Sequence, residues 1–247
     1  MSTIITIARR EIAGFFYSPI AYLVLFLFLV FVGILFGLFV FVPGQVTEMR
    51  TLFDFSRFGL FFIIPLLTMS LFSDEYRSGR MEMLRTSPIT EAQLVLGKYL
   101  GAMAFYVVLV ASTLIFLLLL VIFGRPDYGA VFASYIGMLL LGALFVSIGL
   151  FFSACTQNQL VAALSALIVL AALTLLGDLL APRLPESIKI LGLPLYLRQV
   201  VFYLGVGSHM QDFAKGVIDT AHAAYFLLGT GFFLFLTYLV LESRKWR

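Results

Sequence analysis

The charged side chains most able to do chemistry gather in one block, Ser73–Lys98. It holds eight of the chain's 16 basic and 13 acidic residues. Its Gly97-Lys98 pair is the kind that can cradle a nucleotide phosphate. However, Ala92 stands where Gly-x-x-x-x-Gly-Lys-[Ser/Thr] needs its first glycine, and Tyr99 stands where it needs a hydroxyl. We therefore expect no nucleotide site of this type, and any ATP that drives the protein must bind to another polypeptide.

The remaining candidates for catalysis or metal binding are few. Cys155 is the single cysteine, so there is neither an internal disulfide nor a cysteine metal site. His209 and His222 are 13 positions apart, which is not the spacing of a ligand pair. Ser208 adjoins His209, but neighbours in sequence do not form a nucleophile–base pair by proximity alone. We expect no enzyme, no metal and no cofactor in this chain.

The amino-acid composition indicates whether the protein folds in water or in a membrane. Of 247 residues, 62% are apolar and 12% charged, and the mean hydropathy is +1.08, whereas soluble domains are about 45–50% apolar and about 25% charged. A water-soluble globule could not bury so much apolar surface. The net charge of +3 comes without a basic stripe interleaved with aromatic residues, so we expect a membrane protein in contact with the lipid bilayer and no nucleic-acid partner.

Six apolar stretches predict an all-α, polytopic membrane protein with six transmembrane helices: 20–42, 58–72, 99–123, 129–153, 160–181 and 221–241. The second is short and contains Pro65. Either its helix begins earlier, with Asp54 and Arg57 reaching to the interface, or the segment is re-entrant. We favour a true span.

Residues 1–19 predict an interfacial helix that Ser18-Pro19 terminates, because apolar side chains recur on one face: Ile4, Ile7, Ala8, Ile12 and Phe15. Lysine and arginine are densest beside the ends that lie inside if both termini are cytoplasmic. We therefore expect a multi-pass protein of the cell inner (plasma) membrane with both termini in the cytoplasm.

The block 73–98 then faces the cytoplasm as a helix, a break and a second helix. Asp74 and Glu75 suit the first turn of the first helix, and Pro88 ends it. Thr90-Glu-Ala-Gln93 matches a capping box that starts the second helix. An inert connector is the alternative, but four residues would suffice for that. We interpret the block as an interaction surface.

The pattern Glu75-x-x-x-Gly79-x-x-x-x-Leu84-x-x-x-Pro88, followed by Val95-Leu-Gly-Lys98, resembles the inner loop of permease subunits of type-two ATP-binding-cassette (ABC) exporters. Within that class the chain is most similar to the gliding-motility-associated permease group, through Phe213-Ala-Lys-Gly216-Val-Ile-Asp219, Tyr225-Phe and Leu241-Glu-Ser-Arg-Lys-Trp-Arg247.

This resemblance implies one transmembrane permease domain over residues 1–247, paired with a second copy or a related permease. A separate ABC ATPase, which binds ATP and Mg, would dock on the cytoplasmic coupling helix region 73–98 through Glu75, Gly79, Glu82, Leu84 and Pro88. Some members of the class work on an extracytoplasmic partner subunit. The resemblance also implies that the outer connector 182–220 dips back into the membrane as a gate, interrupted at Pro194 and Gly205; an outer interfacial helix is the alternative.

Other interpretations stay open at this point. An ion-coupled secondary transporter needs ionisable residues in its spans, and the cores of the six stretches have none. A structural or force-transmitting membrane subunit of a larger complex fits the composition equally. Gly33 and Gly37 form a Gly-x-x-x-Gly pair that allows close helix contact, either at a dimer interface or inside the chain.

Overall fold

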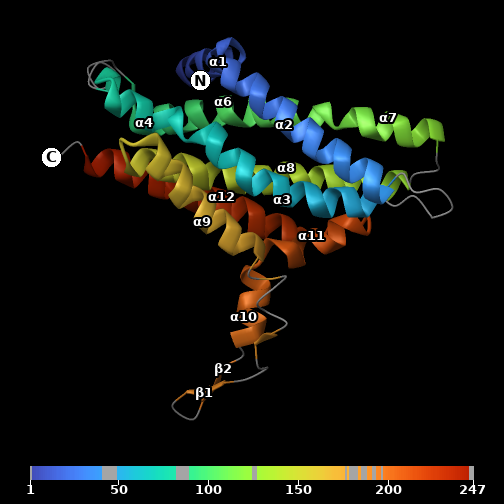
Figure 1. Ribbon diagram of the computed structural model, residues 1–247. Helices are drawn as coiled ribbons and strands as arrows, with labels where there is room; N and C mark the ends of the chain where they lie inside the picture. The colour runs from blue at the N-terminus through green and yellow to red at the C-terminus, as the bar shows by residue number, and fades with distance from the viewer. Residues whose placement is uncertain are drawn as a thin grey trace.

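Long apolar helices run side by side along most of the described chain (Figure 1). The computed structural model describes residues 2–40, 49–81, 89–123, 127–175, 177, 183–184, 188–190, 193–195 and 197–244. Its helices are α1 (Ser2–Tyr17), α2 (Pro19–Leu35) with a π-helical continuation η1 (Phe36–Val40), α3 (Met49–Thr68), α4 (Ser70–Arg77), α6 (Glu91–Ser112), α7 (Leu114–Phe123), α8 (Tyr128–Cys155), α9 (Gln159–Leu175), α10 (Leu197–Leu204), α11 (Val206–Ala214) and α12 (Thr220–Ser243). Two short strands, β1 (Ile188–Ile190) and β2 (Leu193–Leu195), pair antiparallel.

Helix α8 forms the centre of the bundle, in contact with α3, α4, α6, α9, α11 and α12. Small residues on α8 let these helices approach closely: Gly142 lies against the Tyr106 ring, and Gly149 against the Thr68 side chain. The Tyr106 hydroxyl donates to the carbonyl of Met138 at 2.6 Å, so this buried polar group is satisfied. Close packing of this kind takes the place of the hydrophobic effect when helices associate in lipid.

Among the described residues, five helices are long and apolar enough to cross a membrane: Pro19–Phe39, Leu52–Arg77, Glu91–Ile122, Tyr128–Cys155 and Thr220–Ser243. They correspond to the first, second, third, fourth and sixth of the expected spans. In place of the fifth lies α9, whose 17 residues would reach about 25 Å at 1.5 Å per residue. This is shorter than a hydrocarbon core of about 30 Å.

The second span begins earlier than its apolar stretch, as the favoured interpretation expected. The helix is continuous from Met49 to Thr68 with Pro65 inside it, and α4 follows almost directly. The expected reach of Arg57 to the interface is wrong. Its side chain is buried, lies over the Phe58 ring and donates to the carbonyl of Asp54 at 3.2 Å, because the neighbouring helices cover this turn.

Helix α1 ends where the sequence predicts. Ser18 is extended and Pro19 occupies the first turn of α2, the position in which proline costs no hydrogen bond. The apolar face of α1 packs on α6, with Ile7 and Ala8 buried. A protein surface therefore covers much of the face that we expected to lie in the membrane interface.

The connector before α12 leaves the bundle. In Figure 1 the β1–β2 hairpin and α10 project from its side, and α11 returns to it. Helix α11 packs on α8, with Val206, Met210 and Phe213 buried. Gly216, at a φ of 86°, closes the turn into α12 in a conformation that favours glycine.

Candidate functional site

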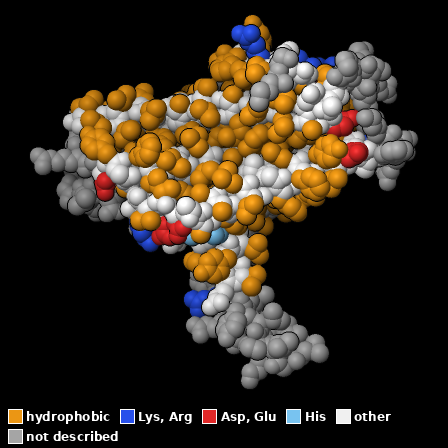
Figure 2. All heavy atoms as spheres, turned by 180° about the vertical axis from the view of Figure 1, so that it is seen from behind, with side chains coloured by type: hydrophobic (Ala, Val, Ile, Leu, Met, Phe, Trp, Pro, Cys, Tyr) orange, Lys and Arg blue, Asp and Glu red, His pale blue; other side chains and the backbone are white. Residues whose placement is uncertain are grey.

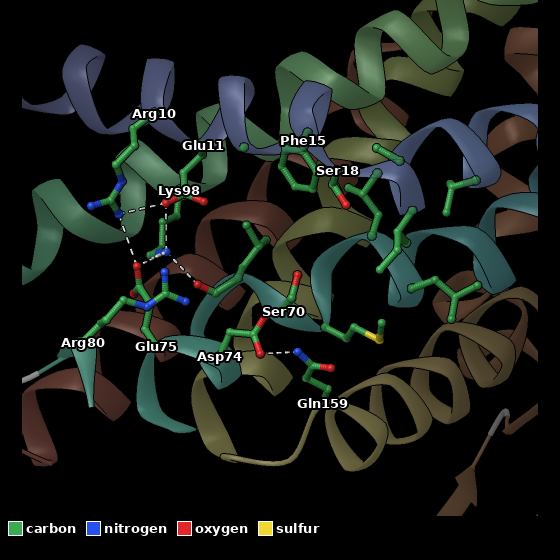
Figure 3. A pocket seen from close by; sticks show the side chains of 18 of the residues that line it. Arg10, Glu11, Phe15, Ser18, Ser70, Asp74, Glu75, Arg80, Lys98 and Gln159 are labelled. Atoms are coloured by element: carbon green, nitrogen blue, oxygen red, sulfur yellow. Dashed lines mark hydrogen bonds and ion pairs between the residues drawn. The ribbon is translucent and has the colours of Figure 1, made fainter. Parts of the chain in front are cut away.

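A cluster of four charged side chains joins α1, α4 and α6 at one end of the bundle (Figure 3). The Lys98 ammonium lies 2.9 Å from Glu75 Oε1 and 3.1 Å from Glu11 Oε1, and donates to the carbonyl of Leu71 at 2.6 Å. The Arg10 guanidinium lies 3.2 Å from Glu75 Oε1 and 3.0 Å from Glu11 Oε1. Two cations therefore face two carboxylates, and we call these four residues the charge cluster.

The cluster depends on close contact between α1 and α6. Gly97 and Gly101 flank Lys98 on α6. A Cβ at Gly97 would lie 2.7 Å from Cβ of Ile7, and one at Gly101 would lie 2.6 Å from Cβ of Glu11. Only glycine leaves room for α1 at this separation. The capping box fixes the start of α6, because the Thr90 hydroxyl accepts from the Gln93 amide and the Gln93 side chain accepts from Thr90 N–H.

Lys98 and Glu75 lie inside the protein. The Lys98 side chain is 1% exposed and the Glu75 side chain 10% exposed. The second carboxylate oxygen of Glu75, Oε2, is buried and makes no hydrogen bond within the described residues. A buried charge is costly unless it is paired, so the ion pair holds α4 and α6 in one relative position.

A cavity of about 770 Å³ opens beside the cluster, bounded by α1, α2, α3, α4, α6 and α9. One end is polar and includes Glu75, Arg80 and Asp74; the other is apolar and includes Val24 and Leu66. Figure 3 shows the charge cluster along one wall and Gln159 on another. The cavity therefore has the mixed lining of a space at the border between lipid and water.

Further contacts connect the same end of the bundle. The Asp74 carboxylate accepts from the Gln159 amide, which joins α4 to α9. Arg244, which ends α12, donates to the carbonyl of Cys155 at 2.5 Å and lies over the Tyr76 ring. The end of α4 is thus connected to the start of α9 and to the end of α12.

Two of the five residues expected to contact an ATPase, Glu75 and Gly79, are among the described residues. Glu75 belongs to the charge cluster. Gly79 has a φ of 70°, so it ends α4 in a conformation that favours glycine; Glu82, Leu84 and Pro88 lie outside the described residues. Asp74 and Glu75 were expected in a first helical turn but occupy the last turns of α4, because the second span runs on without a break. The Glu75 carboxylate is paired with Lys98 and Arg10, and the Asp74 carboxylate accepts from Gln159, so neither relies on the helix dipole.

The other expected sites are dispersed. A Cβ at Gly33 would lie 3.4 Å from the Phe116 ring, and one at Gly37 would have nothing within 4 Å. Gly205 stands between α10 and α11 with its backbone against Gly177. Pro194 pairs with Lys189 in the β1–β2 hairpin. The structure therefore brings none of these four glycine and proline sites to the charge cluster.

Sequence reasoning missed three members of the cluster: Arg10, Glu11 and Lys98. Arg10 and Glu11 lie in the segment 1–19, which was expected to be an interfacial helix on the strength of its apolar residues. A signal was present in Gly97-Lys-Tyr-Leu-Gly101, a second Gly-x-x-x-Gly, since a lysine between two contact glycines lies at a helix interface. Among the described residues, no group of three or more histidine, cysteine, aspartate or glutamate side chains could hold a metal ion.

These features define a class: a multi-pass membrane protein whose spans meet a polar, ion-paired cluster at one end. The model of the ABC-2 family transporter proteins matches residues 5–242, nearly the whole chain. The protein belongs to this family. No curated protein matches the chain. Members of an ABC-2 permease family are membrane components that work with an ATPase subunit.

Proposed function

We propose that this chain is the transmembrane subunit of an ATP-driven exporter, most similar to the gliding-motility-associated group. Two copies, or this chain and a related permease, form the translocation pathway. A separate ATPase subunit binds ATP and Mg and docks on the cytoplasmic side at Gly79, Glu82, Leu84 and Pro88, and Glu75 couples this docking segment to the bundle.

The observation that carries this proposal is the ion pair between Lys98 and Glu75, the latter a few positions before the segment 82–88 in the sequence. Force on that segment reaches α4 through Gly79. From α4 it reaches α6 through Lys98 and α1 through Arg10. If one of these helices moved without the others, paired and buried charges would separate, which is costly. The three helices therefore respond to an ATPase as one unit, in which Glu75 acts inside the permease as a positioning residue.

The proposed arrangement in the membrane has six spans and both termini in the cytoplasm, with α9 and the residues after it as the fifth span. The ends of α4 and α12 lie together, as this arrangement requires. The exposed helix face at Gly37 is our candidate for a dimer contact, with Gly33 one turn away. The connector with Pro194 and Gly205 is our candidate for an outer gate or for the docking site of an extracytoplasmic partner.

An ion-coupled secondary transporter has less support. Within the described spans, ionisable side chains lie near helix ends: Lys98 is the eighth residue of α6, and Arg57 is near the start of Leu52–Arg77. Coupled ions generally bind near the middle of the membrane. Lys98 is moreover already paired with two carboxylates.

Co-purification with an ABC ATPase encoded beside this chain tests the proposal. We expect the two chains to purify together in detergent and the permease to change the rate of ATP hydrolysis after reconstitution in lipid. If the chains neither associate nor affect hydrolysis, the proposed function is wrong.

A further inference from the structure

A chain of hydrogen bonds at the base of the projecting connector contains both histidines of the protein. His209 Nε2 lies 2.8 Å from the carbonyl of Tyr203, His209 Nδ1 lies 2.7 Å from His222 Nδ1, and His222 Nε2 lies 2.8 Å from Asp212 Oδ2. In Figure 2 the histidine atoms lie where the projecting segment meets the bundle, beside acidic and basic side chains.

The number of protons in this series of hydrogen bonds follows from the two groups at its ends, the Tyr203 carbonyl and the Asp212 carboxylate. The carbonyl of Tyr203 and the carboxylate of Asp212 can only accept, so the ring nitrogens facing them must each carry a proton. The contact between the two Nδ1 atoms holds one proton more. Three of the four ring nitrogens are then protonated, whereas two neutral imidazoles carry two protons. The complete chain of hydrogen bonds therefore contains one extra proton.

The surrounding groups favour a positive charge on the pair of rings. Burial lowers the pKa of His209, an effect that the hydrogen bond to Tyr203 opposes. Hydrogen bonds from His222 and Lys215 lower the pKa of Asp212, so its carboxylate stays ionised and can pair with a cation. The ionised Asp212 carboxylate, 2.8 Å from His222 Nε2, therefore faces the pair of rings and can balance the positive charge of one extra proton.

Three helices are joined by this proton. Tyr203 lies at the end of α10, His209 and Asp212 on α11, and His222 in the first turn of α12. The groups that face the two rings are the Asp212 carboxylate, the Lys215 ammonium 3.1 Å from Asp212 Oδ1, and Tyr225, whose ring stacks on His209 at 4.0 Å. The Tyr225 hydroxyl also donates to the carbonyl of Leu204.

We infer that His209 and His222 form a proton-binding site in which one shared extra proton holds α10 against α11 and α12. This inference does not depend on coupling to an ATPase.

Two changes of protonation open the site. When pH rises and the extra proton leaves, only two protons remain for three contacts, so one hydrogen bond is lost. When pH falls and a second extra proton binds, both Nδ1 atoms carry protons and two charged rings repel each other. The attachment of α10 should therefore be strongest at intermediate pH. A site with a single histidine would show one pH-dependent transition in this attachment instead of two.

The ring nitrogens can be counted directly because the chain has two histidines. We would label histidine with ¹⁵N in the full chain, purified through a histidine-free tag and placed in lipid nanodiscs, and record NMR spectra between about pH 5 and 9, where imidazoles titrate. We expect a pH range with three protonated nitrogens and one unprotonated nitrogen. A direct change from four protonated nitrogens to two overturns the inference.

Asp212→Asn separates this site from a merely structural contact. The new amide can donate to His222 Nε2 while its oxygen still accepts from Lys215, so two neutral rings complete the chain of hydrogen bonds. We expect two protonated nitrogens at the pH where the wild type has three. Asp219→Asn is the matched control, since it removes a nearby charge from a helix-capping position and should leave three. Equal counts in wild type and Asp212→Asn overturn the inference.

The position of α10 gives a second readout. In a Cys155→Ser background, spin labels at Val200→Cys and Leu228→Cys report the distance between α10 and α12 at two exposed positions. We expect one narrow distance distribution at intermediate pH and broader ones on both sides. Asp212→Asn should keep the narrow distribution at high pH. A distribution that does not change with pH contradicts a proton-dependent attachment.

Discussion

Lys98 Nζ lies 2.9 Å from Glu75 Oε1, and the lysine side chain is 1% exposed. The pair joins the second turn of α6 to the end of α4, and Glu11 of α1 completes it. Residues separated widely in the sequence thereby become one charged connection between three helices, next to the segment that we propose to contact the ATPase.

Removal of the lysine should destabilise this end of the bundle. Lys98→Met leaves the buried Glu75 and partly buried Glu11 carboxylates with Arg10 as their remaining cation, so we expect the free energy of unfolding to fall by about 3 kcal/mol, near the lower end for a broken buried pair. Glu75→Gln should cost less, because Lys98 keeps Glu11. Unfolding in detergent measures both, and the double variant should be more stable than the sum of the single effects predicts. Additive effects would show that the two side chains do not interact.

The contact between α1 and α6 should not tolerate a methyl group. A Cβ at Gly97 meets Ile7 at 2.7 Å, so we expect Gly97→Ala to lower the free energy of unfolding by about 1–3 kcal/mol. Gly14→Ala is the matched control on α1, where nothing lies within 4 Å and alanine favours the helix. The same detergent unfolding assay compares them, and equal stability of the two variants would argue against the close contact.

The Asp212 carboxyl should titrate at higher pH when its donors are removed. Its pKa is lowered first by the hydrogen bond from His222 and then by that from Lys215. Because the folded state holds this pKa below its ordinary value, the stabilisation is present above the ordinary pKa and is lost as pH falls through the folded pKa. His222→Gln should raise the pKa of Asp212 more than Lys215→Met does. The ¹³C chemical shift of the carboxyl, followed against pH, measures this order.

The arrangement in the membrane can be tested by labelling. In a Cys155→Ser background, a membrane-impermeant thiol reagent should modify Glu82→Cys from the cytoplasmic side and Arg125→Cys from the other side. Lys245→Cys should react like Glu82→Cys. Labelling of positions 82 and 245 from opposite sides would contradict six spans with both termini inside.

Hydropathy and local signals in the sequence were enough to predict most helices. The capping box at Thr90 and Gln93 and the break at Ser18-Pro19 are confirmed, since each depends on neighbouring residues only. The charge cluster depends on helix approach at Gly97, which joins positions 87 residues apart. Periodicity within one helix does not contain that information.

The same distinction between local signals and contacts among distant helices explains why two predictions for the second span differ from the structure. Arg57 is buried because tertiary packing covers it, and a hydropathy profile treats it only as a charge near an interface. Asp74 and Glu75 looked like the first turn of a new helix, but they lie near the end of the second candidate span, Leu52–Arg77. Their partners Gln159, Lys98 and Arg10 come from other helices, so the sequence around α4 alone did not reveal what offsets their charge.

The most direct test of the central claim is the rate of ATP hydrolysis by the reconstituted complex of this permease with its ABC ATPase. Glu75→Gln is compared with Asp74→Asn, which alters the neighbouring carboxylate but can keep the hydrogen bond to Gln159. We predict that Glu75→Gln still assembles with the ATPase but loses at least about fivefold of the permease-dependent change in hydrolysis, while Asp74→Asn stays close to wild type. Wild-type coupling in Glu75→Gln would contradict transmission through the Lys98–Glu75 pair.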